Sequence, residues 1–222
     1  MQEKKRIALI WLRNDLRTTD HYGFYKASKE CDQIFAYYTF DKSHFEKTPW
    51  GFKKSGKFRT KFLLETVRDL QKELSNKNIV LIIEQNSADE GIPKWIEKLQ
   101  VTDLYFQNEW TSEERNVSEK LKKNLSEEIK FHTYYNQFLF HPNDIPFEIK
   151  SLPEIFTVFR KKCEKYCSVK PCLPKIKGFP AENRMLQNFE IPLLTDLGFT
   201  NFETRPNSAF PFEGGSRSGM QR

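Results

Sequence analysis

The sequence predicts an α/β fold: a Rossmann-like five-stranded parallel sheet with helices on both faces, followed by a long wrapping connector. Short apolar runs alternate with helical patterns up to about residue 135. Parallel neighbours need a crossover, and the crossover must cover one face of the sheet. After Asn136 the regular periodicity lapses and prolines punctuate the chain.

Five short runs rich in β-branched and aromatic residues are predicted to be buried strands. They are Arg6–Leu12, Gln33–Phe40, Asn78–Glu84, Asp103–Phe106 and Ile129–Tyr134. Ligands of parallel sheets bind beyond the carboxyl ends of the strands. We therefore expect a site in the loops that follow the first, second and fourth runs, at residues 13–20, 41–47 and 107–114.

Three helices are predicted between the strands, because apolar residues recur there on one face. The three faces hold Phe58, Phe62, Val67, Leu70 and Leu74; Ile92, Trp95, Ile96 and Leu99; and Val117, Leu121 and Leu125. Pro93 is expected in the first turn of the second helix, where a missing amide costs little. Thr111 and Glu114 form a capping-box pattern at the start of the third.

The chain divides into three predicted parts: an α/β domain over residues 1–135, a connector over residues 136–209, and the start of another unit over residues 210–222. One helix is predicted in the connector, over Leu152–Cys167. The aromatic content of the connector is too high for a free linker, so we expect it to wrap around something. After two glycines, Ser216 is expected to cap a further helix.

Composition restricts the class of protein. With 222 residues, 38% of them hydrophobic, the chain can bury a real core. The first residues are charged and no apolar run is long enough to span a bilayer, which predicts a cytoplasmic protein. The formal net charge of +6 allows nucleic acid as a partner without requiring it, because 36 basic residues stand against 30 acidic ones.

Common catalytic and cofactor motifs are absent from the sequence. No G-x-G-x-x-G follows the first strand and no G-x-x-x-x-G-K-[ST] occurs, so ordinary dinucleotide or nucleoside-triphosphate chemistry has no support. The four histidines lack a hydrolase motif and are interpreted as surface or capping residues. Cys163, Cys167 and Cys172 do not have a standard zinc spacing, so we predict reduced thiols, no metal, and packing roles for the first two.

The segment Phe52–Phe62 interleaves five basic residues with three phenylalanines. Two interpretations are open. The segment could track phosphates while its rings stack on bases. Alternatively, it begins an amphipathic helix whose phenylalanines face the core and whose charges face water. We favour the second interpretation.

Glu109, Glu113 and Glu114 lie at a strand end and in the first turn of the following helix. Acidic residues are favoured there by the helix dipole alone, without any ligand. A carboxylate beyond a strand end can also accept hydrogen bonds from an amino-pteridine or flavin-like ring. On the residues alone we favour the dipole explanation.

Several stretches resemble the photolyase and cryptochrome family. IWLRNDLRTTD, followed by FAYYTFD, resembles the first strand of the family and its W-[FL]-R-x-D-L-R loop, and KSGKFRTKFLLETVRDLQKEL is similar to its second crossover helix. DIPFEIKSLPEIFTVFRKKCE is similar to a signature of the DASH-type cryptochromes. VKPCLP, LGF and a G-G motif follow it as in that group. The resemblance covers almost the whole chain.

This resemblance implies a two-part flavoprotein, in which an N-terminal α/β domain and a connector precede a larger helical domain that holds FAD. FEGGSRSGMQR matches the opening of that domain, so residues 210–222 are predicted to be its truncated start. Ser216 replaces the usual Glu of the family, and NQFLFHPNDIPF lacks the S-T-L-Y-H form of its loop. These departures affect the expected contact between the two domains, and they leave the resemblance to the family unchanged.

The resemblance implies light-driven electron transfer from reduced flavin to a cyclobutane pyrimidine dimer flipped out of DNA, with single strands preferred by DASH members. It places the flavin and substrate residues beyond Arg222, so no catalytic residue is named and the fragment alone is expected to be inactive. Many relatives hold a methenyltetrahydrofolate antenna. Glu109 and Glu113 are the candidate residues for contacting its pterin.

Two alternatives stay open. A blue-light photoreceptor without repair activity would share every residue of this chain. A stand-alone Rossmann-like nucleotide- or flavin-binding module would explain the sheet but not the connector. Pro206–Phe212 and parts of the connector would normally rest against the partner domain, so they are expected to be exposed in the fragment, which is expected to self-associate through that surface.

Overall fold

The computed structural model describes residues 5–185, 187–203 and 212–221, and its centre is a five-stranded parallel sheet with strand order β3-β2-β1-β4-β5. The predicted fold class is confirmed, and the end of each predicted strand is within two residues of the observed one. The strands are β1 (Ile7–Trp11), β2 (Gln33–Thr39), β3 (Val80–Glu84), β4 (Asp103–Gln107) and β5 (Lys130–Tyr134).

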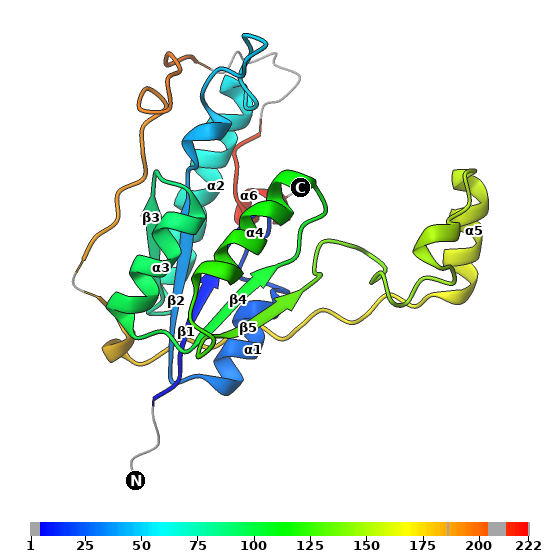
Figure 1. Cartoon of the computed structure of the whole chain (residues 1–222), viewed down its shortest axis with the longest axis horizontal. Helices are drawn as coiled ribbons and strands as arrows, with labels where there is room; N and C mark the ends of the chain where they lie inside the picture. Colours follow the sequence, from blue (N-terminus) through cyan, green and yellow to red (C-terminus); the bar gives the residue numbers. More distant parts are fainter. Residues whose placement is uncertain (1–4, 186, 204–211, 222) are drawn as a thin grey trace.

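Four helices connect the strands: α1 (Tyr22–Glu30), α2 (Lys57–Ser75), α3 (Ala88–Leu99) and α4 (Ser112–Asn124). Right-handed crossovers place α1 and α2 on one face of the sheet. The chain reverses direction between β3 and β4, so α3 and α4 lie on the other face, in contact with each other (Figure 1). The helix α1 is not predicted from the sequence, because it has only nine residues, includes Gly23 and begins after His21, which is not one of the usual N-cap residues.

The sheet is buried at its centre and open at one edge. Leu9 in β1 and Leu104 and Phe106 in β4 have no exposed surface. In β5, by contrast, only Tyr134 is buried. The prediction that all five strands are buried is therefore wrong for β5, because an edge strand has a neighbour on one side only.

Two predictions about helix starts have different outcomes. Thr111 caps α4 as predicted, since its Oγ1 accepts a hydrogen bond from the backbone N–H of Glu114 at 3.3 Å. Pro93 does not lie in the first turn of α3. The helix begins earlier than expected, after Ser87 as the N-cap, so the proline is its sixth residue.

The favoured interpretation of the Phe52–Phe62 segment is wrong for its phenylalanines. Phe58 is 58% exposed, and Phe62 is also exposed. Instead of entering the core, Phe58 packs edge-on against Phe202 of the connector, with ring centroids 4.9 Å apart. Lys53 Nζ donates a hydrogen bond to the carbonyl of Gly198 at 2.8 Å. Part of the segment therefore anchors the connector.

The connector has two halves with different surroundings. The first half, which we call the arm (residues 139–172), carries α5 (Phe156–Tyr166) and projects away from the sheet (Figure 1). The helix predicted over Leu152–Cys167 is confirmed but shorter. The second half, the return segment (residues 173–203), runs back along the body and buries Ile176, Phe189 and Leu197.

The last described element, α6 (Ser216–Met220), lies against α2. Its N-cap is Gly215 rather than the predicted Ser216, because the backbone at Gly215 has φ 118°, which favours glycine. A Cβ at Gly214 would lie 2.1 Å from the carbonyl oxygen of Phe62, so this glycine permits the close approach to α2. Arg217 pairs with Asp69 of α2.

Residues 204–211 lie outside the described part of the chain. The predicted boundary between residues 209 and 210 therefore stays a prediction, as does the predicted exposure of Pro206–Phe212 except at Phe212, which is exposed.

Candidate functional site

The carboxyl ends of β1 and β4 form the topological switch point of the sheet. From β1 the chain crosses towards β2 and β3, and from β4 it crosses towards β5 on the other side. The loops that leave these two neighbouring strands therefore diverge, and ligands of open α/β sheets bind at such a point. Two of the three loops predicted from the sequence meet there, and the loop after β2 lies beside them.

Arg13 ties the loop after β1 to α4. Its guanidinium donates hydrogen bonds to Ser118 Oγ and to the carbonyl of Glu114, both at 2.9 Å. It also lies over the ring of Trp11, 4.6 Å from the ring centroid. Burial lowers the pKa of Arg13, partly offset by the neighbouring acidic residues. The two sides of the switch point are thus held at a fixed separation.

Asp15, His21 and Tyr134 form a buried polar group beneath this loop. His21 Nε2 lies 3.0 Å from Asp15 Oδ2, and Tyr134 Oη donates to the same oxygen at 3.2 Å. His21 Nδ1 accepts from the N–H of Phe24, so the ring proton must be on Nε2. Burial alone would raise the pKa of Asp15, but the contacts with His21 lower it. The predicted capping role of a histidine is confirmed for His21, which is buried rather than on the surface.

Glu109, a predicted site residue, is half-buried at the switch point. Its Oε1 accepts hydrogen bonds from Asn14 Nδ2 and from Gln107 Nε2, both at 3.1 Å. Burial raises the pKa of Glu109, against the effect of these hydrogen bonds. Gln107 Oε1 is buried without a hydrogen-bond partner among the described residues. The end of β4 therefore holds a fixed carboxylate and an unpaired acceptor side by side.

Glu113, the second predicted site residue, has a different environment. Its side chain is 70% exposed and pairs with Lys54 Nζ at 2.8 Å. The hydrogen bond and the charge of Lys54 lower the pKa of Glu113. The hydrogen bonds of Glu109 therefore point to the β1 loop, whereas Glu113 faces the β2–α2 loop. The carboxylates of Glu109 and Glu113 therefore do not share a hydrogen-bond partner among the described residues.

Sequence reasoning did not single out Asn14 or Trp110. Asn14 Nδ2 donates to Glu109 and also to Glu114 Oε1, at 3.2 Å. Trp110 is exposed and stacks on Tyr135, with ring centroids 5.0 Å apart and an interplanar angle of 25°. Tyr135 directly follows β5, and Trp110 lies three residues beyond the end of the neighbouring parallel strand β4. That position was the signal available in the sequence.

The arrangement is suited to holding a flat ring with amino substituents. Glu109 supplies a hydrogen-bond acceptor, and the exposed side chain of Trp110 supplies an aromatic surface. Within the described ranges, no group of three or more His, Cys, Asp and Glu residues could hold a metal ion. The four cysteines are free thiols, with Cys163 buried and Cys167 partly exposed. The site supports binding rather than covalent chemistry.

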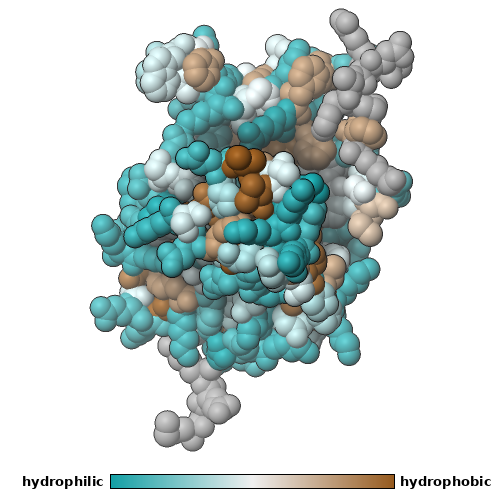
Figure 2. All heavy atoms as spheres, turned by 90° about the vertical axis from the view of Figure 1, so that its right-hand side faces the viewer, coloured by the Kyte–Doolittle hydropathy of each residue, from teal (hydrophilic) through white to brown (hydrophobic). Residues whose placement is uncertain are grey.

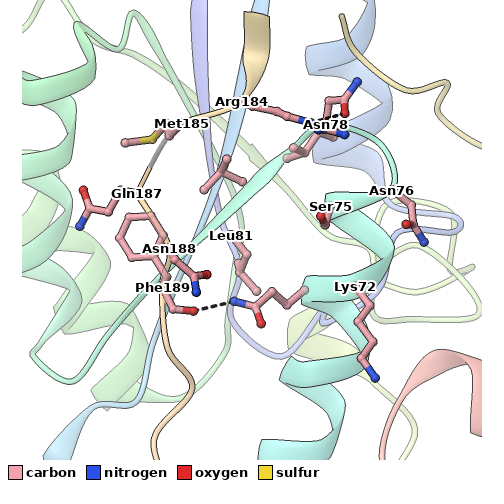
Figure 3. A pocket seen from close by; sticks show the side chains of 13 residues that line it. Lys72, Ser75, Asn76, Asn78, Leu81, Arg184, Met185, Gln187, Asn188 and Phe189 are labelled. Atoms are coloured by element: carbon pink, nitrogen blue, oxygen red, sulfur yellow. Dashed lines mark hydrogen bonds between the residues drawn. The ribbon is translucent and has the colours of Figure 1, made fainter. Parts of the chain in front are cut away.

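A cavity of about 520 Å³ lies elsewhere, beside the amino end of β3 (Figure 3). Asn78 and Arg184 lie together at one end of it, with Arg184 Nε donating to Asn78 Oδ1 at 2.6 Å. Gln71 Nε2 donates to the carbonyl of Phe189 at 2.7 Å. The cavity is the incompletely filled space between α2, β3 and the return segment. It is far from the carboxyl ends of the strands, so we do not assign the site to it.

A doubly wound parallel sheet with fixed polar groups at its switch point defines an α/β ligand-binding domain. Residues 8–180 match the family model described as DNA photolyase, and the chain belongs to this family. The matched part corresponds to the N-terminal α/β domain of photolyases. Among the residues that the structure describes, no helix is both long and apolar enough to cross a membrane.

Curated relatives and solved structures agree with this assignment. The chain is 36% identical over 221 residues to Cryptochrome DASH of Gloeobacter violaceus, covering 98% of this chain and 43% of the relative. It is 33% identical to Cryptochrome DASH of Danio rerio, covering 98% and 42%. A Synechocystis cryptochrome structure matches with TM-score 0.89 and 32% identity, over 100% of this chain and 46% of that one. The chain thus spans under half the length of these relatives.

A Sulfolobus tokodaii photolyase, solved with two FAD molecules, has TM-score 0.74 and 22% identity over 97% of this chain and 45% of that one. At this identity the likeness extends to the fold alone. The fold is therefore shared across DASH cryptochromes and a more distant photolyase.

Proposed function

We propose that this chain serves as the antenna-binding N-terminal domain of a light-dependent DNA-repair flavoprotein, a deoxyribodipyrimidine photolyase of the DASH cryptochrome group. The carrying observation is that similarity to Cryptochrome DASH proteins extends along 98% of the chain. Photolyases generally bind FAD and an antenna chromophore and act on DNA. In the whole protein, FAD would be held by a helical domain that the present chain does not contain.

The repair reaction would transfer an electron from reduced flavin to a cyclobutane pyrimidine dimer. The dimer must leave the base stack, which costs least in single-stranded DNA and agrees with a preference for that substrate. No residue of this chain is assigned a catalytic role, and the chain alone is expected to be inactive. We propose the domain limits 1–135, 136–209 and 210–222, and a cytoplasmic location.

The local task of this domain would be to hold methenyltetrahydrofolate near the flavin. Glu109 is the stronger candidate, because Asn14 and Gln107 fix its carboxylate at the switch point. Glu113 would contribute only by exchanging its partner Lys54 for the pterin. The antenna supplies light absorption and energy transfer, for which the protein must provide fixed distance and orientation.

The antenna assignment is tested in the full-length protein by counting folate per flavin from absorbance. Glu109→Ala should lower bound folate about tenfold, because a hydrogen-bonded charged acceptor is lost. Glu113→Ala should have a smaller effect. Glu119→Ala, in α4 and also exposed, is the matched control. Unchanged folate in both site variants would remove the assignment.

The placement of FAD is tested on the present chain. Purified protein should lack bound flavin, because no described residue is assigned to a flavin pocket. A yellow chain with stoichiometric FAD would overturn this placement and favour a stand-alone flavin-binding module.

A second candidate function is blue-light reception without repair. It is favoured by 29% identity over 199 residues to an Arabidopsis thaliana protein named Blue-light photoreceptor PHR2. Illuminating the full-length protein with dimer-containing single-stranded DNA separates the two functions. Restored pyrimidines indicate repair, whereas flavin photoreduction with intact dimers indicates a receptor.

We also infer that the chain alone self-associates through its arm. The arm projects to the right in Figure 1, and Figure 2 shows the molecule from that side. Apolar side chains gather in the middle of this face. Ile155 and Phe156 at the start of α5 are exposed. Exposed apolar patches promote association. Light scattering after gel filtration should show oligomers, and a monodisperse monomer at all concentrations would contradict this inference.

A further inference from the structure

A tight turn at residues 48–52, in the loop between β2 and α2, is built by its own hydrogen bonds. The N–H of Thr48 donates to the carbonyl of Phe52 at 2.8 Å, and the N–H of Gly51 donates to the carbonyl of Thr48 at 2.9 Å. Gly51 has φ 86°, which favours glycine. Lys47 and Lys53 pair across the base of the turn as an antiparallel bridge. The tip therefore has a defined conformation.

This turn presents two aromatic rings to solvent. Trp50 is 79% exposed and Phe52 is 61% exposed. Their planes are nearly parallel, at 20°, with ring centroids 6.4 Å apart. Single rings on a protein surface need no explanation, but a paired and oriented set on a hydrogen-bonded turn is a stacking platform. No role in the sheet or in the candidate antenna site accounts for it.

The surroundings of the turn are strongly basic. Residues 42–61 contain seven Lys and Arg residues against one acidic residue, Glu46, so this stretch has a net charge of +6, equal to that of the whole chain. Lys53 and Lys54 are used internally, on Gly198 and Glu113. The exposed side chains of Lys42 and Lys47 have no hydrogen-bond or ion-pair partner within the part of the chain that the structure describes. This charge selects an anionic partner.

We propose that this turn binds single-stranded nucleic acid, with Trp50 and Phe52 stacking on unpaired bases and Lys42 and Lys47 facing the phosphates. Bases in a duplex are stacked on one another and cannot offer their faces to the rings. Exposed rings beside a basic groove are the combination that single-strand binders use. The proposal does not rest on the repair function, because it needs neither flavin nor light.

The test measures binding of a fluorescein-labelled oligothymidylate of about 16 nucleotides to the present chain by anisotropy. The double variant Trp50→Ala/Phe52→Ala should bind about tenfold more weakly at constant salt. The matched control is Tyr166→Ala, which removes an exposed ring from the end of α5. Its affinity should equal that of the unmodified chain. Thermal melting of all variants checks that they are folded.

Two further measurements separate stacking from charge attraction. Bound oligothymidylate should quench the fluorescence of Trp50, and Trp50→Phe should lose that quenching while binding within about twofold. Lys42→Gln/Lys47→Gln should lower the slope of log affinity against log salt by about 1.4. Both measurements keep the proposal testable if the double aromatic variant does not fold.

Unchanged affinity of the Trp50→Ala/Phe52→Ala variant for the oligothymidylate would overturn the proposal. An equal loss of affinity in the α5 control would do so too. So would binding that leaves tryptophan fluorescence unquenched and is as tight for a duplex as for the single strand. If the aromatic variant changes only the oligomeric state, the turn is instead a contact between copies of this chain.

Discussion

The two halves of the connector are similar in composition and opposite in environment. In the arm, Ile155 and Phe156 are exposed, and α5 lies well away from the sheet in Figure 1. In the return segment, Ile176 and Phe189 are buried, and Phe189 packs edge-on against Trp95 of α3. Apolar side chains of the connector are therefore buried where the connector packs against the sheet domain, and they stay exposed where it projects away.

The surface that the return segment covers is the β3 edge of the sheet. Pairing between β2 and β3 begins at Phe35 and Val80, so the backbone of Ile34 has no β3 partner. The side-chain amide of Asn183 takes that place, accepting from the N–H of Ile34 at 3.0 Å and donating to its carbonyl at 2.9 Å. The return segment is thus held to the sheet both by the hydrogen bonds of Asn183 and by its buried apolar side chains.

The largest expected difference between the two halves concerns matched phenylalanines. Phe189→Ala should lower the free energy of unfolding by about 3 kcal/mol, because a buried ring is removed and leaves a cavity. Phe156→Ala should change it by less than about 0.5 kcal/mol. Urea denaturation followed by circular dichroism measures both. An equal loss of unfolding free energy in both variants would contradict the difference between the two halves of the connector.

A smaller effect is expected at Asn183. Asn183→Ala leaves the N–H and carbonyl of Ile34 buried without partners, along with the carbonyl of Asn78, so the free energy of unfolding should fall by about 2 kcal/mol. Asn188→Ala, an exposed asparagine of the same segment, is the control and should be neutral. If both variants are neutral, the return segment is held by its apolar contacts alone.

Acid should unfold the sheet domain and the return segment in a single transition. Burial would raise the pKa of Asp103, but hydrogen bonds from Arg6, Thr102 and His132 lower it to about 2. Because this pKa is below the unfolded value, the stabilisation is present above about pH 4 and is lost as the pH falls towards 2.

Denaturation midpoints measured between pH 5 and pH 2 should therefore fall, and Asp103→Asn should reduce that dependence. Tryptophan fluorescence, to which Trp95 at the contact with Phe189 contributes, should change at the same pH as the far-ultraviolet signal. Separate transitions would mean that the return segment is not part of the same folding unit.

The smallest effect is expected in the arm. Ile155→Ser should change the free energy of unfolding by less than about 0.5 kcal/mol, because the side chain is already exposed. The same variant should reduce self-association of the chain in light scattering. A cost above about 1 kcal/mol would show that the arm packs on the body in solution.

Much of the fold could be predicted because strand signals are local. Each of the five strands is an apolar run within the residues that form it. The errors arise where local pattern and tertiary position differ. Phe58 lies on the apolar side of its helix, but it is exposed and packs against Phe202 instead of the core. β5 reads as a buried strand but lies at an edge.

The candidate site was predictable in part for the same reason. Glu109 could be proposed because it lies just beyond the end of β4, in the loop where the family resemblance implies a contact with the pterin. Its partner Asn14 is 95 residues earlier in the chain, and no spacing rule connects the two. The separation of Glu109 from Glu113 depends on Lys54, which belongs to a third loop.

The sequence by itself determined the α/β class, the alternation of strands and helices and the family resemblance, because apolar periodicity and motifs are properties of short stretches. Only the tertiary structure decided which half of the connector is buried, that Asn183 completes the sheet edge, and which carboxylate lies at the switch point. These features depend on contacts between residues far apart in the chain, and such contacts exist only after the sheet has assembled.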